Sequence, residues 1–239
     1  MTENTQIRMK RLISEGVVIV ISILLAFTID AKWAQHQVQQ EEKVALASIQ
    51  SEFEENLKQL DYVIDYHLQA REHMSQLFNL PDETIQQLTQ TEISDIILST
   101  SNPLTFDPIL GTSKSLVDSG KLGIIEKPAL RSAITSFLNI ISDFEEDEYY
   151  MRENALDIWR QDVKFGGPWT DGVTERSVNG SVQGFDFIPK ISHAEILLIR
   201  ADPKFKSLTS RYHLNIGYYI LELNRAKERI AEVLRLIAE

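Results

Sequence analysis

The hydrophobic positions of the chain fall into one continuous run near the N-terminus, followed by several stripes of helical spacing. Residues 16–29 contain no charge, and the apolar stretch covers residues 12–33 if Glu15 and Asp30 lie at its edges. A helix needs about 20 apolar residues to cross a bilayer. We therefore predict a transmembrane helix over residues 12–33, with Glu15 and Asp30 at the two interfaces and Trp33 as an aromatic anchor.

Two other interpretations of this segment are open. A cleaved signal peptide has a similar apolar run, although only Ala26-Phe27-Thr28 offers a weak small-x-small cleavage site. A buried core helix can also be this apolar. We favour an uncleaved anchor. Within it, Ser22 and Ala26 have the spacing that lets two membrane helices approach closely, although lipid-facing filler is the simpler interpretation of small residues.

The charges around the segment predict its orientation. Residues 1–11 carry a net charge of +2, because three basic residues outnumber Glu3, so the rest of the chain sums to −13 out of a total of −11. Basic flanks of membrane helices stay in the cytoplasm. We therefore expect residues 1–11 to be a cytoplasmic tail and residues 34–239 to form an extracytoplasmic domain.

The chain after the membrane segment has the pattern of a long amphipathic helix. Residue 34 begins a stretch with no Gly or Pro before Pro81, in which apolar residues recur at steps of three and four. The stripe consists of Leu46, Ile49, Phe53, Leu57, Leu60, Ile64 and Leu68, followed by the position of Arg71. These steps repeat every eleven residues, which is typical of a straight helix or one with a slight right-handed twist, rather than of a left-handed coiled coil. We predict one stalk-like helix to about Asn79, with one face buried.

Proline, glycine and capping residues divide the next part of the chain. They predict helices over residues 81–101, 112–119 and about 128–164, the second of which ends at Gly120. Residues 166–191 then hold five of the ten glycines, so we expect an irregular segment there.

Two weaker patterns follow in and after the irregular segment. Asn179-Gly180 lies between short alternating stretches and favours a β-hairpin. Ser192 and Glu195 have the spacing of a capping box, which predicts the start of a short helix.

The last helix, from Pro203, is expected to pack along the stalk. Its stripe consists of Phe205, Leu208, Tyr212, Ile216, Tyr219, Leu223, Ala226, Ile230, Val233 and Ile237. The connecting loops favour an antiparallel arrangement, in which the C-terminus returns toward the membrane. The fold class we predict is all-α: a transmembrane helix continues into a stalk helix that packs in an extracytoplasmic helical bundle, with one irregular Gly-rich segment.

Three separate stretches resemble a known family. The first is Glu15, an apolar run ending in Ile23-Leu24-Leu25-Ala26, then Ile29-Asp30 and Trp33. The second comprises Ser115-Leu116-Val117, Ser119-Gly120, Leu122, Ile125 and Leu130-Arg131, and the third is Asp202-Pro203-Lys204-Phe205. Together they resemble an uncharacterised bacterial family of single-pass, membrane-anchored helical proteins, known only as a domain of unknown function. The resemblance implies one N-terminal membrane helix, in the inner (cytoplasmic) membrane of a bacterium, and a helical domain. It assigns no activity or catalytic residue.

The residues offer little chemistry. The absence of cysteine excludes thiol catalysis, thiolate metal sites and disulfides, and the five histidines form no HExxH pair. Asp61, Asp65 and His67 could gather a cation, but solvated positions on a helix are the simpler interpretation. The acidic run at residues 145–148 lacks the spacing of a calcium loop. We expect no metal and no cofactor, and an acidic body disfavours nucleic-acid binding.

Phe165 and Trp169 are the most site-like residues, because they flank glycines in the irregular segment and could contact a partner or ligand. A role of Trp169 in the core is the simpler interpretation. The function we favour is a membrane-anchored interaction or scaffold protein of the bacterial envelope, which binds a protein partner or itself and is not an enzyme. The alternative is an extracytoplasmic ligand-sensing helical-bundle domain that acts through a partner.

Overall fold

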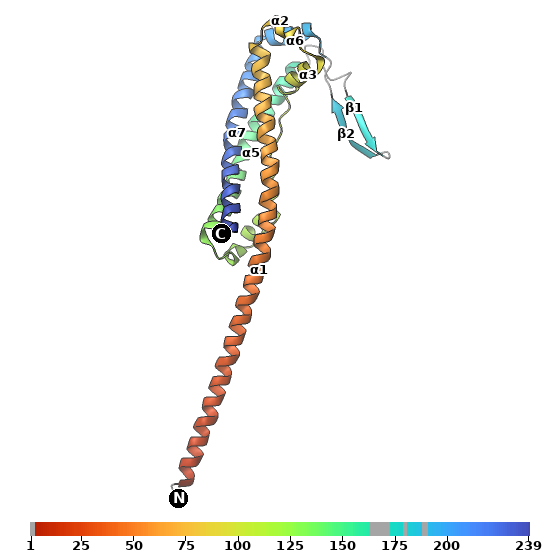
Figure 1. The fold of residues 1–239 in the computed structure, drawn as a ribbon. Coiled ribbons are helices and arrows are strands. Elements are labelled where there is room, and N and C mark those ends of the chain that lie inside the picture. The colour runs from red at the N-terminus through yellow and green to blue at the C-terminus, as the bar shows by residue number, and fades with distance from the viewer. Residues whose placement is uncertain (1–2, 163–172, 179–180, 188–190) are drawn as a thin grey trace.

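Three long helices dominate the computed structural model, which describes residues 3–162, 173–178, 181–187 and 191–239 (Figure 1). The elements are α1 (Glu3–Asn79), α2 (Asp82–Ile85), α3 (Gln90–Leu98), α4 (Gly111–Asp118), the 3₁₀ helix η1 (Lys121–Ile124), α5 (Pro128–Asp162), β1 (Val173–Val178), β2 (Ser181–Phe187), α6 (His193–Ala201) and α7 (Pro203–Ala238).

Helix α1 is one unbroken helix of 77 residues, which corresponds to a length of roughly 115 Å. Its N-terminal part stands clear of the rest of the molecule, and its C-terminal half packs beside α5 and α7 (Figure 1). The prediction that the apolar segment continues directly into a stalk helix ending near Asn79 is confirmed.

Helix α7 packs along α1 in the antiparallel direction, as predicted. Three contacts define the pairing: Phe78 with Phe205 at 6.5 Å between ring centroids, His67 with Tyr219 at 5.3 Å, and the Asp61 carboxylate with Lys227 Nζ at 2.6 Å. Residue numbers fall along α1 as they rise along α7. The C-terminus of α7 therefore lies beside the middle of α1, next to the part that stands clear.

Helix α5 completes the core. Its N-terminal half packs on α1 through Phe137, whose ring centroid is 4.8 Å from that of Phe53. It runs antiparallel to α7, since Lys127 just before α5 bonds to the last turn of α7 while Asp157 near its other end pairs with Arg211 near the start of α7. The largest fully buried side chains include Tyr212, Tyr219, Phe53, Phe137 and Phe205.

The buried face of α1 departs from the predicted stripe after Ile64. Leu68 is 52% exposed, so its place in the predicted stripe was wrong, whereas Arg71 is half-buried and donates from Nε to His213 of α7 at 3.4 Å. The core face is continued instead by His67, Ala70, Met74 and Leu77. His67 can take a core position because its ring nitrogen Nε2 finds a backbone carbonyl as a hydrogen-bond partner.

The predicted single helix over residues 81–101 is two helices, α2 and α3. Thr89 interrupts it: its hydroxyl accepts from the backbone N–H of Glu92, and the Glu92 carboxylate accepts from the backbone N–H of Thr89 at 2.7 Å. This reciprocal capping box starts a new helix at residue 90. The other helices begin and end close to their predicted bounds, with Gly120 in the left-handed conformation (φ 69°) after α4 and the Ser192–Glu195 capping box at α6.

One β-hairpin departs from the otherwise helical fold. Strands β1 and β2 pair antiparallel, from Val173 opposite Phe187 to Val178 opposite Ser181. This agrees with the hairpin that the Asn179-Gly180 pair predicts, although residues 179–180 themselves lie outside the described residues. Part of the segment expected to be irregular is therefore a β-hairpin, whose register shifts between Arg176 and Ser177.

Candidate functional site

Residues 102–110, which we call the connecting segment, join α3 to α4 without secondary structure of their own. Side chains of α1 bind its backbone. The Tyr66 hydroxyl donates to the Asn102 carbonyl at 2.8 Å, His67 Nε2 lies 2.7 Å from the Leu104 carbonyl, and the Asn56 amide exchanges two hydrogen bonds with the backbone of Ile109. These polar residues on α1 thus supply hydrogen-bond partners for backbone groups of a segment that has no helix or strand of its own.

Glu52 of α1 continues this set of contacts at the start of α4. Its carboxylate is 6% exposed and accepts hydrogen bonds from the backbone N–H groups of Thr112, at 2.6 Å, and Ser113, at 3.2 Å, and from the Ser113 hydroxyl. A carboxylate at this position satisfies N–H groups that have no partner within the helix and favours the positive end of the helix dipole. Glu52 therefore acts as the cap that Leu110, the residue before α4, cannot provide.

Tyr219 of α7 joins the connecting segment to α5. Its hydroxyl accepts from the backbone N–H of Phe106 at 2.9 Å and donates to Glu148 Oε1 at 2.7 Å. Burial, and then the nearby Glu148 charge, raises the pKa of the Tyr219 hydroxyl. Burial also raises the pKa of the Glu148 carboxyl, and the hydrogen bond from Tyr219 and the charge of Arg152 oppose this rise.

His67 lies at the centre of these contacts and is fully buried. Because its Nε2 faces the Leu104 carbonyl, Nε2 carries the proton and Nδ1 is left as an acceptor, which has no hydrogen-bond partner in the described part of the chain. Burial lowers the pKa of the His67 ring, against the effect of the Leu104 hydrogen bond. The ring packs edge-on against Tyr66 and Tyr219, so the neutral imidazole is the form that this environment holds.

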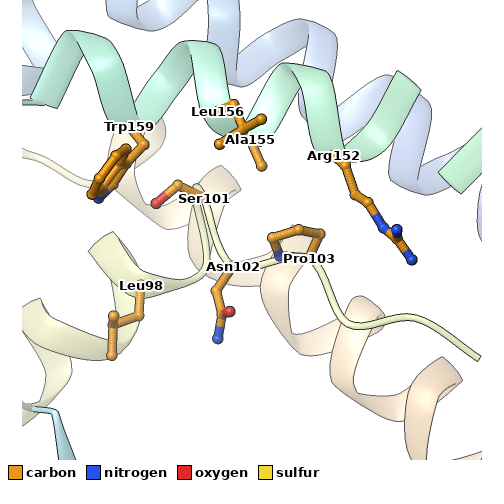
Figure 2. A pocket seen from close by; sticks show the side chains of 8 residues that line it. All are labelled: Leu98, Ser101, Asn102, Pro103, Arg152, Ala155, Leu156 and Trp159. Carbon is orange, nitrogen blue, oxygen red and sulfur yellow. The ribbon is translucent and has the colours of Figure 1, made fainter. Parts of the chain in front are cut away.

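A pocket opens beside the connecting segment, where this segment, the end of α3 and the C-terminal half of α5 meet (Figure 2). It encloses about 620 Å³. The lining residues are Leu98, Ser101, Asn102, Pro103, Arg152, Ala155, Leu156 and Trp159. Figure 2 shows the four residues of α5 facing the other four across the pocket, with Trp159 and Arg152 at opposite ends. The walls are mainly apolar, and the polar groups come from Ser101, Asn102 and Arg152.

The apolar N-terminal segment is a second candidate site. Within the described residues, α1 is the one helix long and apolar enough to cross a membrane: its most apolar window has a mean hydropathy of 2.0, and none of that window is buried. The run over residues 16–29 has two hydroxyl groups, and both bond within the helix: Ser22 to the Val18 carbonyl at 2.8 Å and Thr28 to the Leu24 carbonyl at 2.7 Å. No side chain of this run therefore presents a polar group that needs water.

The residues singled out in the sequence lie apart from the pocket. Glu15, Asp30 and Trp33 are exposed on α1, and the Trp33 ring lies 6.4 Å from that of His36. Ser22 and Ala26 are exposed one turn apart on the same helix. Phe165 and Trp169 lie outside the described residues.

The candidate cation ligands do not converge. Asp61 pairs with Lys227, and Asp65 is exposed. His67 is buried, so the interpretation of His67 as a solvated residue was wrong. Among the described residues, no group of three or more His, Cys, Asp or Glu side chains could hold a metal ion.

Sequence reasoning missed the polar residues that α1 buries. Glu52, Asn56 and His67 lie on the same face as Ile49 and Leu60, at helical spacing. Their spacing relative to these apolar residues could have identified them in the sequence, because a polar residue on a buried helix face needs a buried polar partner. The partners themselves, which are backbone groups of the connecting segment, follow no pattern visible in the sequence.

The sequence signature of a family of unknown function, DUF6090, matches residues 15–153. Since this is more than half of the chain, the chain belongs to that family, in agreement with the resemblance noted in the sequence. The match begins at Glu15 and includes the connecting segment, whereas α7 and the Asp202–Phe205 stretch lie outside it. No curated protein and no solved structure matches the chain.

Proposed function

We propose that this member of the DUF6090 family is a single-pass, membrane-anchored scaffold protein of the bacterial envelope, whose helical body binds a protein partner or a second copy outside the cytoplasm. The observation that carries the proposal is the continuity of α1, which is both the exposed apolar segment and one of the core helices of the body. A helix shared in this way transmits the position and direction of the anchor to the body without a flexible joint.

The dimensions of the apolar segment support a membrane anchor. Residues 12–33 of a helix extend about 33 Å, which fits the hydrocarbon core of about 30 Å. A soluble helix of this kind would leave residues 16–29, exposed throughout, in contact with water. Contact with lipid avoids the unfavourable exposure of this apolar surface to water, and Glu15, Asp30 and Trp33 then lie at the interfaces.

The charges support an orientation with the body outside. The tail of +2 favours the cytoplasmic side, whereas the remainder of the chain sums to −13. The acidic body is also repelled by anionic head groups, so a stalk that holds it away from the bilayer suits its charge.

The stalk separates the body from the bilayer by a short distance. The end of the body nearest the anchor is held by Glu42, whose carboxylate accepts from the backbone N–H of Glu126 at 2.6 Å, and by Lys127, which donates to the Leu236 carbonyl at 2.9 Å. Glu42 is nine positions after Trp33, which corresponds to about 14 Å of helix. The C-terminus thereby returns to within about 15 Å of the proposed interface.

The outward face of α7 is the surface that we assign to partner binding. Leu214, Tyr218 and Leu221 follow one another at steps of four and three, on the side opposite the buried stripe, and are 55%, 56% and 60% exposed. Two copies anchored in one membrane share their orientation and are confined to two dimensions, which raises their effective concentration. A stripe that runs along the stalk can then meet its own copy about a two-fold axis perpendicular to the membrane.

Cysteine labelling tests the topology, because the chain has no native cysteine. Intact spheroplasts that express Glu153→Cys or Thr5→Cys are treated with a membrane-impermeant maleimide. We expect labelling of the Glu153→Cys variant in intact cells and of the Thr5→Cys variant only after permeabilisation. The reverse pattern contradicts the orientation, and a mature N-terminus beyond Thr28 shows cleavage in place of anchoring.

The same cysteine-free background tests the binding face. In native membranes, Leu221→Cys is oxidised or treated with a short bis-maleimide, and Glu153→Cys, exposed on α5, is the control. A dimer formed by the Leu221 variant alone identifies a second copy, and a defined hetero-adduct formed by it alone identifies a partner. If neither product exceeds that of the control, α7 is not the binding face.

A further inference from the structure

The pocket between α3, the connecting segment and α5 has the size and lining of a small-molecule site. Its volume of about 620 Å³ falls within the usual range of about 300–1,000 Å³ for ligand pockets. The side chains of Leu98, Pro103 and Leu156 supply apolar walls on both sides. The walls come from three separate parts of the chain, so the surface is concave, unlike the convex face of α7.

The two ends of the pocket differ in chemistry. Trp159, which is 45% exposed, provides an aromatic surface at one end, and Arg152 provides a guanidinium at the other (Figure 2). They are seven positions apart on α5, which corresponds to about 10 Å along the helix. A ligand that uses both ends is therefore elongated, with an apolar body and one polar terminus.

The charge of Arg152 favours an anion as the polar terminus. Arg152 lies 3.3 Å from Glu148 in its one ion pair among the described residues, and its side chain remains 55% exposed. The guanidinium offers five N–H donors in a planar fork that matches a carboxylate. The Ser101 hydroxyl, whose oxygen is buried, points toward the Trp159 side of the pocket in Figure 2, so Arg152 alone provides the charged group at the polar end.

We propose that this pocket binds a small, elongated apolar carboxylate, which lies along Leu156 against Trp159 and places its carboxylate on Arg152. This site is separate from the binding face on α7 and does not depend on it.

A short series of contacts connects Arg152 to the core of the body. A ligand carboxylate competes with Glu148 for the guanidinium, and Glu148 is the acceptor of the Tyr219 hydroxyl. Tyr219 holds the connecting segment through the Phe106 N–H and packs against His67 of α1. The site is therefore linked by direct contacts to the helix that carries the membrane segment.

Biphenyl-4-carboxylate is a suitable probe, because its rigid apolar body matches the length of the pocket, and biphenyl-4-carboxamide is its neutral counterpart. Binding to the full chain in lipid nanodiscs is measured by isothermal titration calorimetry, with empty nanodiscs subtracted. We expect saturable binding of the acid. The amide should bind at least about tenfold more weakly, because a charge-assisted hydrogen bond is lost.

Three variants separate the contributions. Arg152→Gln should weaken binding of the acid about tenfold or more while leaving the amide unchanged, and Trp159→Ala should weaken both. Arg160→Gln is the control, since Arg160 is exposed on the same helix, pairs with Asp157 and does not line the pocket. The proposal is overturned if the wild-type chain does not bind the acid, if acid and amide bind equally, or if Arg152→Gln binds the acid as the wild-type chain does.

Discussion

The hydroxyl of Tyr219 on α7 donates a hydrogen bond of 2.7 Å to the carboxylate of Glu148 on α5. The same hydroxyl accepts from the backbone of Phe106, so one oxygen atom links two long helices and the connecting segment. Because the groups involved are largely removed from water, their loss leaves buried polar groups without partners. This makes the contact a determinant of how the body is held together.

Replacing Tyr219 with Phe tests this contact. Tyr219→Phe removes the acceptor of the Phe106 N–H and the hydrogen bond to Glu148 Oε1, so that Arg152 remains as the partner of this carboxylate, and it should lower the free energy of unfolding by about 1–3 kcal/mol. Tyr218→Phe, an exposed neighbour, is the matched control and should change stability by less than about 0.5 kcal/mol. Urea denaturation of the full chain in detergent, followed by circular dichroism, measures both. Equal stabilities of the two variants would mean that the Tyr219 hydroxyl is not required.

Replacing Glu52 with Ala tests the cap of α4. The change leaves two backbone N–H groups and the Ser113 hydroxyl without their acceptor and should cost about 2–4 kcal/mol of stability. Glu55→Ala is the control on the same helix, because Glu55 is exposed and pairs with Lys58. Hydrogen exchange at residues 111–118 should accelerate in the first variant only. Unchanged protection of α4 would contradict the role of Glu52.

His67 should make the stability of the body depend on pH. Burial lowers the pKa of the ring in the folded state below its value of about 6.5 in the unfolded chain, so the unfolded state binds more protons. This contribution is fully present above about pH 6.5 and is lost as the pH falls from there through the lowered folded-state pKa, at no more than about 1.4 kcal/mol per pH unit.

The His67→Gln variant isolates this effect, because the Gln amide can still donate to the Leu104 carbonyl. The wild-type chain should lose more stability than this variant between about pH 6.5 and pH 5. The raised pKa of Glu148 acts in the opposite direction and is common to both proteins, so it cancels in the comparison. His36→Gln, an exposed control, should retain the wild-type profile. Parallel profiles of the wild-type chain and His67→Gln would show that His67 titrates normally.

Sequence patterns predicted the long helices well, because each has a stripe of three- and four-residue steps and a clear start or end. The stripe of α7 is buried or half-buried from Phe205 to Ile237. Prediction was weaker where a polar group decides the structure. The Thr89–Glu92 capping box splits one predicted helix into two, and His67 continues the core face that Leu68 was expected to occupy.

The pocket could not be predicted from the sequence, for a different reason. Its walls come from α3, the connecting segment and α5, and their approach depends on hydrogen bonds between side chains of α1 and the backbone of the connecting segment. Such contacts leave no periodic pattern. Arg152, Leu156 and Trp159 do fall on one face of α5, but that spacing alone does not distinguish a pocket from an ordinary exposed helix surface.

Energy transfer from the body to lipid head groups tests most directly whether α1 carries the body outward and α7 returns to the bilayer. A donor is attached to Glu239→Cys or to Glu83→Cys in the full chain, and an acceptor is confined to the head groups of the vesicle. Residue 79 lies about 69 Å along α1 from Trp33, whereas the C-terminus of α7 lies near residue 42, about 14 Å along it. We predict strong transfer from position 239 and weak transfer from position 83. Equal transfer from the two positions, or stronger transfer from position 83, would contradict the account.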